Sequence, residues 1–146
     1  MNIPPREVLR SMSGLDFLTA IMDGRLPTPP MAQTLHFRLS KVEHGAVTFR
    51  GEPGPLFYNP IGTVHGGYAA TLLDSCMACA VHSTLAAGTG YTTLEIKVNL
   101  VRPITEATGP VDAAGKVIHV GRTTATAEGR LTDKAGKLLA HGTTTC

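Results

Sequence analysis

The chain has 146 residues, of which 42% are hydrophobic and 16% charged, a composition typical of one folded globular domain rather than of a disordered chain. A formal net charge of +2, with basic residues scattered singly, argues against a nucleic-acid partner. No stretch approaches the roughly 18 consecutive apolar residues of a membrane span, and the N-terminus lacks the apolar region of a secretory signal. Three cysteines, an odd number, do not suggest a disulfide framework. We therefore expect a cytoplasmic protein with no membrane partner.

The N-terminal segment predicts a helical extension followed by a stiff connector. Apolar residues recur at helical spacing over residues 6–22, and the Ser-Gly pair at 13–14 is expected to divide this stretch into two pieces. The sequence LPTPP at 26–30 stops any helix and acts as a connector. We therefore divide the single domain into an extension at 1–30 and a core at 31–146.

A β-hairpin is predicted next. Residues 34–40 alternate apolar and polar side chains, which is the period-two pattern of a half-buried strand. A turn at 43–45 leads to a second strand at 46–50.

One long apolar helix is predicted from about Gly67 to Leu85. Its apolar residues are spaced so that they share one face of a helix: Ala69, Leu72, Leu73, Cys76, Met77 and Ala80. The opposite face is small and weakly polar, so we expect most sides of this helix to be covered.

The remaining sequence predicts only strands. Residues 91–103 alternate most cleanly, and 110–120, 122–132 and 137–145 follow with short connections, as in an antiparallel meander. The predicted fold class is α+β: an antiparallel sheet wrapped around one long central helix, which buries the apolar face of each.

The first candidate site is His65-Gly66-Gly67, at the junction of loop and helix. Successive glycines let a ligand approach the backbone, and the free N–H groups of a first helical turn suit a developing oxyanion. The alternative is a tight turn that needs two glycines and a histidine that only caps the helix. The sequence leaves both interpretations open.

Asp74 is the second candidate, because it is the only acidic residue in the predicted helix. An Asp in a helix middle is unfavourable by propensity and costly to bury without a partner. Its functional interpretation is a carboxylate that acts as nucleophile or general base. The alternative is that it faces solvent or pairs with a basic residue.

These two candidates are too far apart to act together within one chain. Nine helical residues at about 1.5 Å each separate His65 from Asp74 by roughly 13 Å. Either the two are unrelated, or the site lies between two subunits whose antiparallel helices bring Gly66 of one chain to Asp74 of the other.

A metal or redox site at Cys76, Cys79 and His82 is less well supported. No second ligand pair is visible, and this spacing drifts around a helix rather than converging. We expect these thiols to serve as small apolar residues, with no metal and no cofactor. Asn59 is either the start of a turn with Pro60 or a donor into the site.

The combined motifs resemble the hotdog-fold thioesterases of the phenylacetate-degradation (PaaI-like) type. They are N-P-x-G-x-x-H-G-G at 59–67, an Asp nine residues after the His, and T-T-L-x-I-K-V-N-L-x-R-P at 92–103. The resemblance covers about residues 34–146. It implies a hotdog fold that dimerises with active sites between subunits, often pairs into homotetramers, and hydrolyses acyl-CoA thioesters without a metal.

The resemblance also implies roles for individual residues. Asp74 would be the nucleophile or general base, and the Gly66 N–H would hold the thioester carbonyl oxygen. Asn59 and His65 would shape the same half of the site as Gly66, and a hydroxyl near the next strand would position water, with Thr93 as the first match. Further substrate contacts are expected from three residues: Gly67, Thr92 and Arg102. Lys97 and Arg122 are other cations available to the CoA nucleotide, which is part of the substrate.

Two other functions fit the same motifs less closely. A hotdog enoyl-CoA hydratase or dehydratase would also combine a His with a carboxylate, and a non-catalytic acyl-CoA-binding module would keep the fold alone. The acyl group is not predictable from periodicity, because it depends on how Met77 and residues 56–58 pack.

Overall fold

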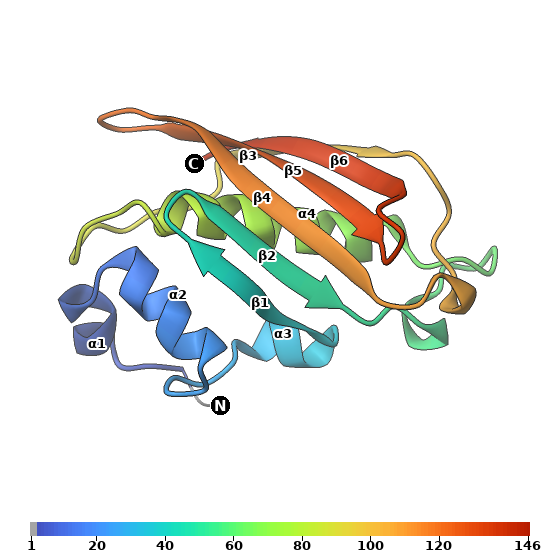
Figure 1. Ribbon diagram of the computed structural model, residues 1–146, viewed down its shortest axis with the longest axis horizontal. Helices are drawn as coiled ribbons and strands as arrows, with labels where there is room; N and C mark the ends of the chain where they lie inside the picture. Colours follow the sequence, from blue (N-terminus) through green and yellow to red (C-terminus); the bar gives the residue numbers. More distant parts are fainter. Residues whose placement is uncertain (1–2) are drawn as a thin grey trace.

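The computed structural model describes residues 3–146 and shows a six-stranded antiparallel sheet with one long helix against one face (Figure 1). The strands are β1 (Phe37–Glu43), β2 (Ala46–Gly51), β3 (Glu95–Leu100), β4 (Val111–Val120), β5 (Ala125–Asp133) and β6 (Leu138–Thr145), and the long helix is α4 (Gly66–His82). The spatial order of the strands is β1-β2-β4-β5-β6-β3. The predicted α+β fold class is confirmed.

The position of β3 differs from the prediction. The four-strand meander is wrong, because β3 pairs with β6 at the far edge of the sheet and only β4, β5 and β6 form a meander. The chain between β3 and β4 contains Pro103, Pro110 and a 3₁₀ turn at Glu106–Thr108, so it crosses the end of the sheet instead of closing a tight hairpin. Alternation predicts a strand but not its neighbours.

Helix α4 packs its apolar face directly on the sheet. The six residues predicted to share that face are all at most 2% exposed. A Cβ atom at Gly115 of β4 would lie 2.3 Å from the Cys76 carbonyl oxygen, so this strand touches the helix backbone itself. The close approach explains why a helix with small side chains is covered as expected.

The C-terminal end of α4 comes three residues earlier than predicted. The helix ends at His82, and the hydroxyl of buried Ser83 donates to the Ala80 carbonyl (2.7 Å) while accepting from the Gly45 N–H (2.7 Å). Ser83 therefore ties the last helical turn to the β1–β2 turn, and residues 83–94 form a loop.

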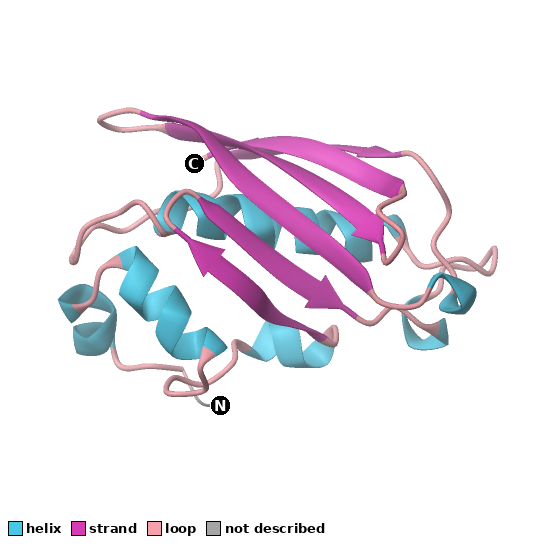
Figure 2. Cartoon of the chain, viewed as in Figure 1, coloured by secondary structure: helices cyan, strands magenta, loops and turns pink. Residues whose placement is uncertain are grey.

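Three short helices precede the sheet and lie along its β1 edge (Figure 2). They are α1 (Arg6–Ser11), α2 (Gly14–Met22) and α3 (Pro30–Thr34). The predicted break at 13–14 is confirmed, because Ser13 caps α2 by accepting from the Asp16 N–H (3.1 Å). Residues 1 and 2 of the 1–30 extension lie outside the described residues.

The strand predicted at 34–40 starts later, at Phe37. Pro30 starts a helix instead of only stopping one, since proline suits the first helical position, and α3 then occupies the chain to Thr34. Helix α2 packs against both β1 and α4. Among residues 3–146, no helix is both long and apolar enough to cross a bilayer.

Candidate active site

Asp74 lies half-buried at the middle of α4. Its Oδ1 atom accepts a hydrogen bond from the Thr93 hydroxyl (2.8 Å), and no ion pair reaches it within residues 3–146. The carboxylate lines a cavity of about 440 Å³, together with Thr92 and Thr93. Asp74 is therefore oriented by one neutral donor and faces open space, and the alternative of an ion pair with a basic residue is not formed by the described residues.

Thr92 and Thr93 belong to the loop before β3 rather than to the strand predicted at 91–103. The segment is held in place because the Leu94 N–H donates to the Thr145 carbonyl (2.8 Å), extending the β3–β6 pairing by one bond. The hydroxyl of Thr93 can therefore reach back to α4.

His65 and Gly66 form the start of α4. His65 is the N-cap residue, and its Nδ1 atom accepts from the Gly67 N–H (2.9 Å), so the capping interpretation describes its side chain. The Gly67 N–H, expected to contact substrate, is engaged by this bond. The Gly66 N–H donates to no acceptor among residues 3–146, and Gly66 lines a second cavity of about 260 Å³. One amide of the helix start is thus free to bind an oxyanion.

Asn59 organises the loop that leads to this helix start. Its Oδ1 atom accepts from the N–H groups of Ile61 (3.1 Å) and Thr63 (3.2 Å), and its Nδ2 atom donates to the Thr63 hydroxyl (2.9 Å). The turn interpretation is therefore correct for the Asn59 oxygen. Asn59 also lines the Gly66 cavity, and one of its two amide hydrogens has no acceptor within residues 3–146. Thr63 was not among the predicted residues, and only its spacing from Asn59 in the sequence could have indicated it.

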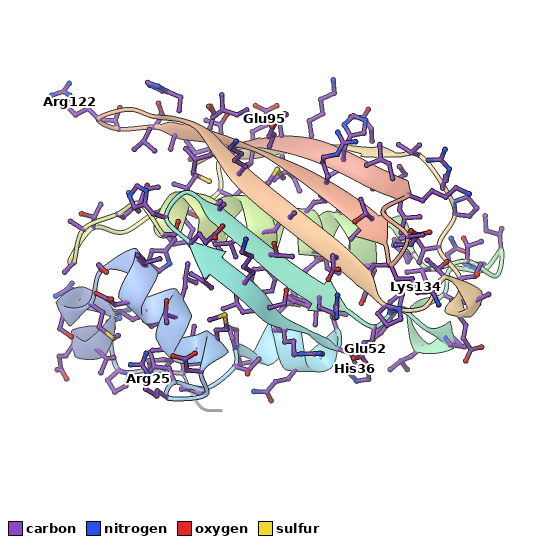
Figure 3. The ribbon with its side chains drawn as sticks, in the orientation of Figure 1. Arg25, His36, Glu52, Glu95, Arg122 and Lys134 are labelled. Carbon is purple, nitrogen blue, oxygen red and sulfur yellow. The ribbon has the colours of Figure 1, made fainter. Side chains whose placement is uncertain are left out.

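The three candidate cations differ in position. Arg102 lines the Gly66 cavity, and its guanidinium donates to the Leu138 carbonyl. Arg122 lies at the outer tip of the β4–β5 hairpin, away from that cavity (Figure 3). Lys97 is exposed on β3. Arg102 is therefore the cation of the three that lies next to the free Gly66 amide.

The Asp74 cavity and the Gly66 cavity have no lining residue in common. Gly66 and Asp74 are eight helical positions apart, which corresponds to roughly 12 Å along α4. One chain thus carries two separate candidate half-sites on the same helix: a carboxylate with a hydroxyl, and a free amide with Asn59 and Arg102.

The cysteines and His82 behave as core residues. Within residues 3–146, no three His, Cys, Asp or Glu side chains are grouped as they would be to hold a metal ion. Burial raises the pKa of the Cys79 thiol to about 12, and also raises the pKa of Cys76. The His82 ring lies between those of Phe17 and Tyr91, with centroids 5.6 and 4.6 Å away. These protonated thiols are poor metal ligands at neutral pH.

This environment of His82 predicts a pH-dependent stability. Burial lowers the pKa of His82 below its ordinary value of 6.5, so the unfolded chain binds this proton first as the pH falls. The free energy of unfolding should therefore decrease as the pH drops below 6.5, and less so in His82→Phe. Urea unfolding at several pH values between about 7 and about 5 measures this difference. If the free energy of unfolding falls equally with pH in the wild type and in His82→Phe, the buried His82 is not the cause of the pH dependence.

Comparison with known proteins identifies the family of this chain. The family model of the Thioesterase superfamily matches residues 61–140, a range that includes the start of α4, Asp74 and Thr93. The chain belongs to the Thioesterase superfamily.

Individual relatives agree with the family match. The chain is 26% identical over 109 residues to the 1,4-dihydroxy-2-naphthoyl-CoA hydrolase of Listeria monocytogenes serotype 1/2a (strain 10403S), covering 75% of this chain and 87% of the relative. Among solved structures, the phenylacetic acid degradation-related protein of Ralstonia eutropha JMP134 matches with a TM-score of 0.80 and 29% identity, covering 89% of this chain and 98% of that one. A mutant of the phenylacetic acid degradation protein PaaI from Thermus thermophilus matches with a TM-score of 0.72 and 26% identity, covering 80% of this chain and 96% of that one. The protein is a thioester hydrolase with a PaaI-like hotdog fold.

Proposed function

We propose that this protein hydrolyses acyl-CoA thioesters to a free acid and CoA at a site formed by two subunits. The observation that carries the proposal is the Asp74–Thr93 hydrogen bond beside an open cavity, with no cation on Asp74 within residues 3–146. The name of the Listeria relative, a hydrolase of an acyl-CoA, supports the choice of substrate class.

The reaction needs one group from each half-site. The Gly66 N–H polarises the thioester carbonyl and stabilises the negative oxygen of the tetrahedral intermediate. Asp74 either takes a proton from the attacking water or attacks the carbonyl carbon itself. The carbon–sulfur bond then breaks and the CoA thiolate leaves, taking up a proton that came from water. If Asp74 is the nucleophile, a water molecule then hydrolyses the Asp74–acyl anhydride, which releases the free acid and restores the carboxylate. No step requires a metal or cofactor, because the carboxylate and the amide supply the base and the electrophilic assistance.

The direction of β3 supports the joining of the two half-sites across a dimer. Thr93, just before β3, is bonded to Asp74, whereas Leu100, at its end, lies beside Gly66. The strand therefore runs from beside Asp74, at the middle of α4, toward Gly66 at the start of α4. If β3 pairs antiparallel with the β3 of a second copy, Gly66 of each chain comes toward Asp74 of the other.

The outer edge of β3 also has the character of an interface. β3 is an edge strand, so its outer N–H and C=O groups are free for pairing. Four large apolar side chains in and around it are exposed: Leu94, Ile96, Leu100 and Val101. Such a strand is unusual on the surface of a monomer. Arg102 follows it directly and supplies a positive charge for the phosphates of CoA at the mouth of the site.

A thiol-release screen tests this function. Purified protein is mixed with saturated acyl-CoAs, and free CoA is measured with a thiol reagent. An enoyl-CoA is followed in parallel by the loss of its enone absorbance. We expect thiol release from at least one saturated acyl-CoA. Loss of enone absorbance without thiol release would favour a hydratase, and binding without either change would favour a non-catalytic module.

A further inference from the structure

The Asp74 cavity adjoins a second, more enclosed cavity under the N-terminal extension. This second cavity has a volume of about 210 Å³, lies between α2 and the β1–β2 end of the sheet, and is called the inner chamber below. Four residues line both cavities: Pro29, Ala32, Phe49 and Cys79. The two cavities are therefore neighbours, and these four shared residues, called the neck below, lie between them.

The inner chamber is apolar. Its walls are formed mainly by aliphatic side chains of the extension and β1: Leu18, Ile21, Met22 and Leu39. The Cys79 thiol at the neck is neutral, because burial raises its pKa to about 12. An apolar guest would gain from leaving water here, whereas a charged guest would lose its hydration.

Charged groups near the chamber are already paired with each other. Arg38, which touches the chamber, forms an exposed ion pair with Glu52 (3.2 Å). Asp23 and Arg25 pair at 3.3 Å after the end of α2, and Figure 3 shows Arg25 on the outer side of that helix. Neither Asp23 nor Arg25 lines the chamber.

Ala32 is the neck residue at which a larger side chain would change the two cavities most. It is buried and is the smallest of the four neck residues, so a longer side chain there would project into the adjoining space. Ala32 belongs to α3 and the inner wall belongs to α2, and both helices pack against β1, so the inner chamber is formed by the sheet together with the helices that precede it.

We propose that the inner chamber holds the far end of an extended apolar acyl chain, so that the N-terminal extension sets the acyl length that the enzyme accepts. The thioester carbon would lie at Asp74, the first part of the chain in the Asp74 cavity, and its end beyond the neck, between α2 and β1. This inference rests on the proposed hydrolysis at Asp74, since that reaction fixes where the chain begins.

Substitutions at the two ends of the passage test the proposal. Ala32→Leu fills the neck, and Ile21→Phe fills the far wall without touching the Asp74 cavity. In the wild type, kcat/KM should be higher for decanoyl-CoA than for acetyl-CoA. The ratio of the two should fall about tenfold in each variant, because roughly two buried methylene groups account for such a factor. Ala135→Leu, the same change as at Ala32 on an exposed turn, is the matched control and should keep the wild-type ratio.

The outcomes separate this proposal from the proposed function. If the wild type releases CoA but neither variant changes the decanoyl to acetyl ratio, the inner chamber is not the acyl site, although the hydrolysis stands. If the wild type releases no CoA from any substrate, hydrolysis is rejected. Titration calorimetry with decanoyl-CoA then tests whether the inner chamber binds the acyl chain. Binding that is weakened by Ala32→Leu and by Ile21→Phe supports the chamber, and unchanged or absent binding rejects it. Thermal unfolding shows which variants are folded, and the conclusion is drawn from those.

Discussion

Replacing Asp74 with Asn should lower kcat by a factor of about 10² to 10⁴, the usual contribution of a general base, and by more if the carboxylate is the nucleophile. The amide has nearly the same shape as the carboxylate, and its oxygen can still accept from the Thr93 hydroxyl. It cannot take a proton from water. The loss should therefore appear in thiol release while the temperature of unfolding changes little.

A matched change controls for the loss of one negative charge. Glu128→Gln makes the same replacement of carboxylate by amide at an exposed position of β5, and it should keep wild-type turnover. Near-normal hydrolysis by Asp74→Asn would remove Asp74 from its role, whatever the control shows.

Gly66→Pro should reduce kcat by about 10²- to 10³-fold, the effect of removing one oxyanion donor. Proline is tolerated at the first helical position, and His65 before it already has the extended backbone (φ −59°, ψ 137°) that proline requires. The substitution therefore deletes a single N–H and leaves the start of α4 intact.

Gly66→Ala is the control for this change. Both substitutions add a Cβ atom 2.6 Å from the Leu100 Cδ1 atom, which belongs to an exposed side chain that can move aside. Only alanine keeps the N–H, so Gly66→Ala should retain most of the activity that Gly66→Pro loses. Equal losses of kcat in the two variants would show that crowding at Leu100, and not the loss of the Gly66 N–H, lowers the activity.

Much of the fold could be predicted because its signals are local. The apolar face of α4, the break at Ser13 and the alternation of the strands each follow from neighbouring residues. The place of β3 beside β6 could not be predicted, because it depends on how the connection after Val101 crosses the sheet. The start of α3 at Pro30 was missed for a similar reason, since proline both ends and begins helices.

Only part of the candidate site could be predicted from the sequence. The sequence singled out Asp74 and Thr93 as candidates, and their hydrogen bond in the structure explains how a polar group is accommodated on an apolar helix. It did not identify the neck or the inner chamber, which bring α2 and α3 together with Phe49 of β2 and Cys79 of α4. Met77, expected to influence the depth of the acyl site, is fully buried and does not line the Asp74 cavity.

Subunit mixing tests most directly the claim that the two half-sites act across an interface. Asp74→Asn and Gly66→Pro chains are co-expressed in equal amounts, and thiol release is compared with that of each variant alone. Random pairing gives about a quarter of the sites an intact Asp74 and an intact Gly66 from different chains, so we expect about a quarter of wild-type activity from two nearly inactive variants. A mixture no more active than its components would contradict a site shared between subunits.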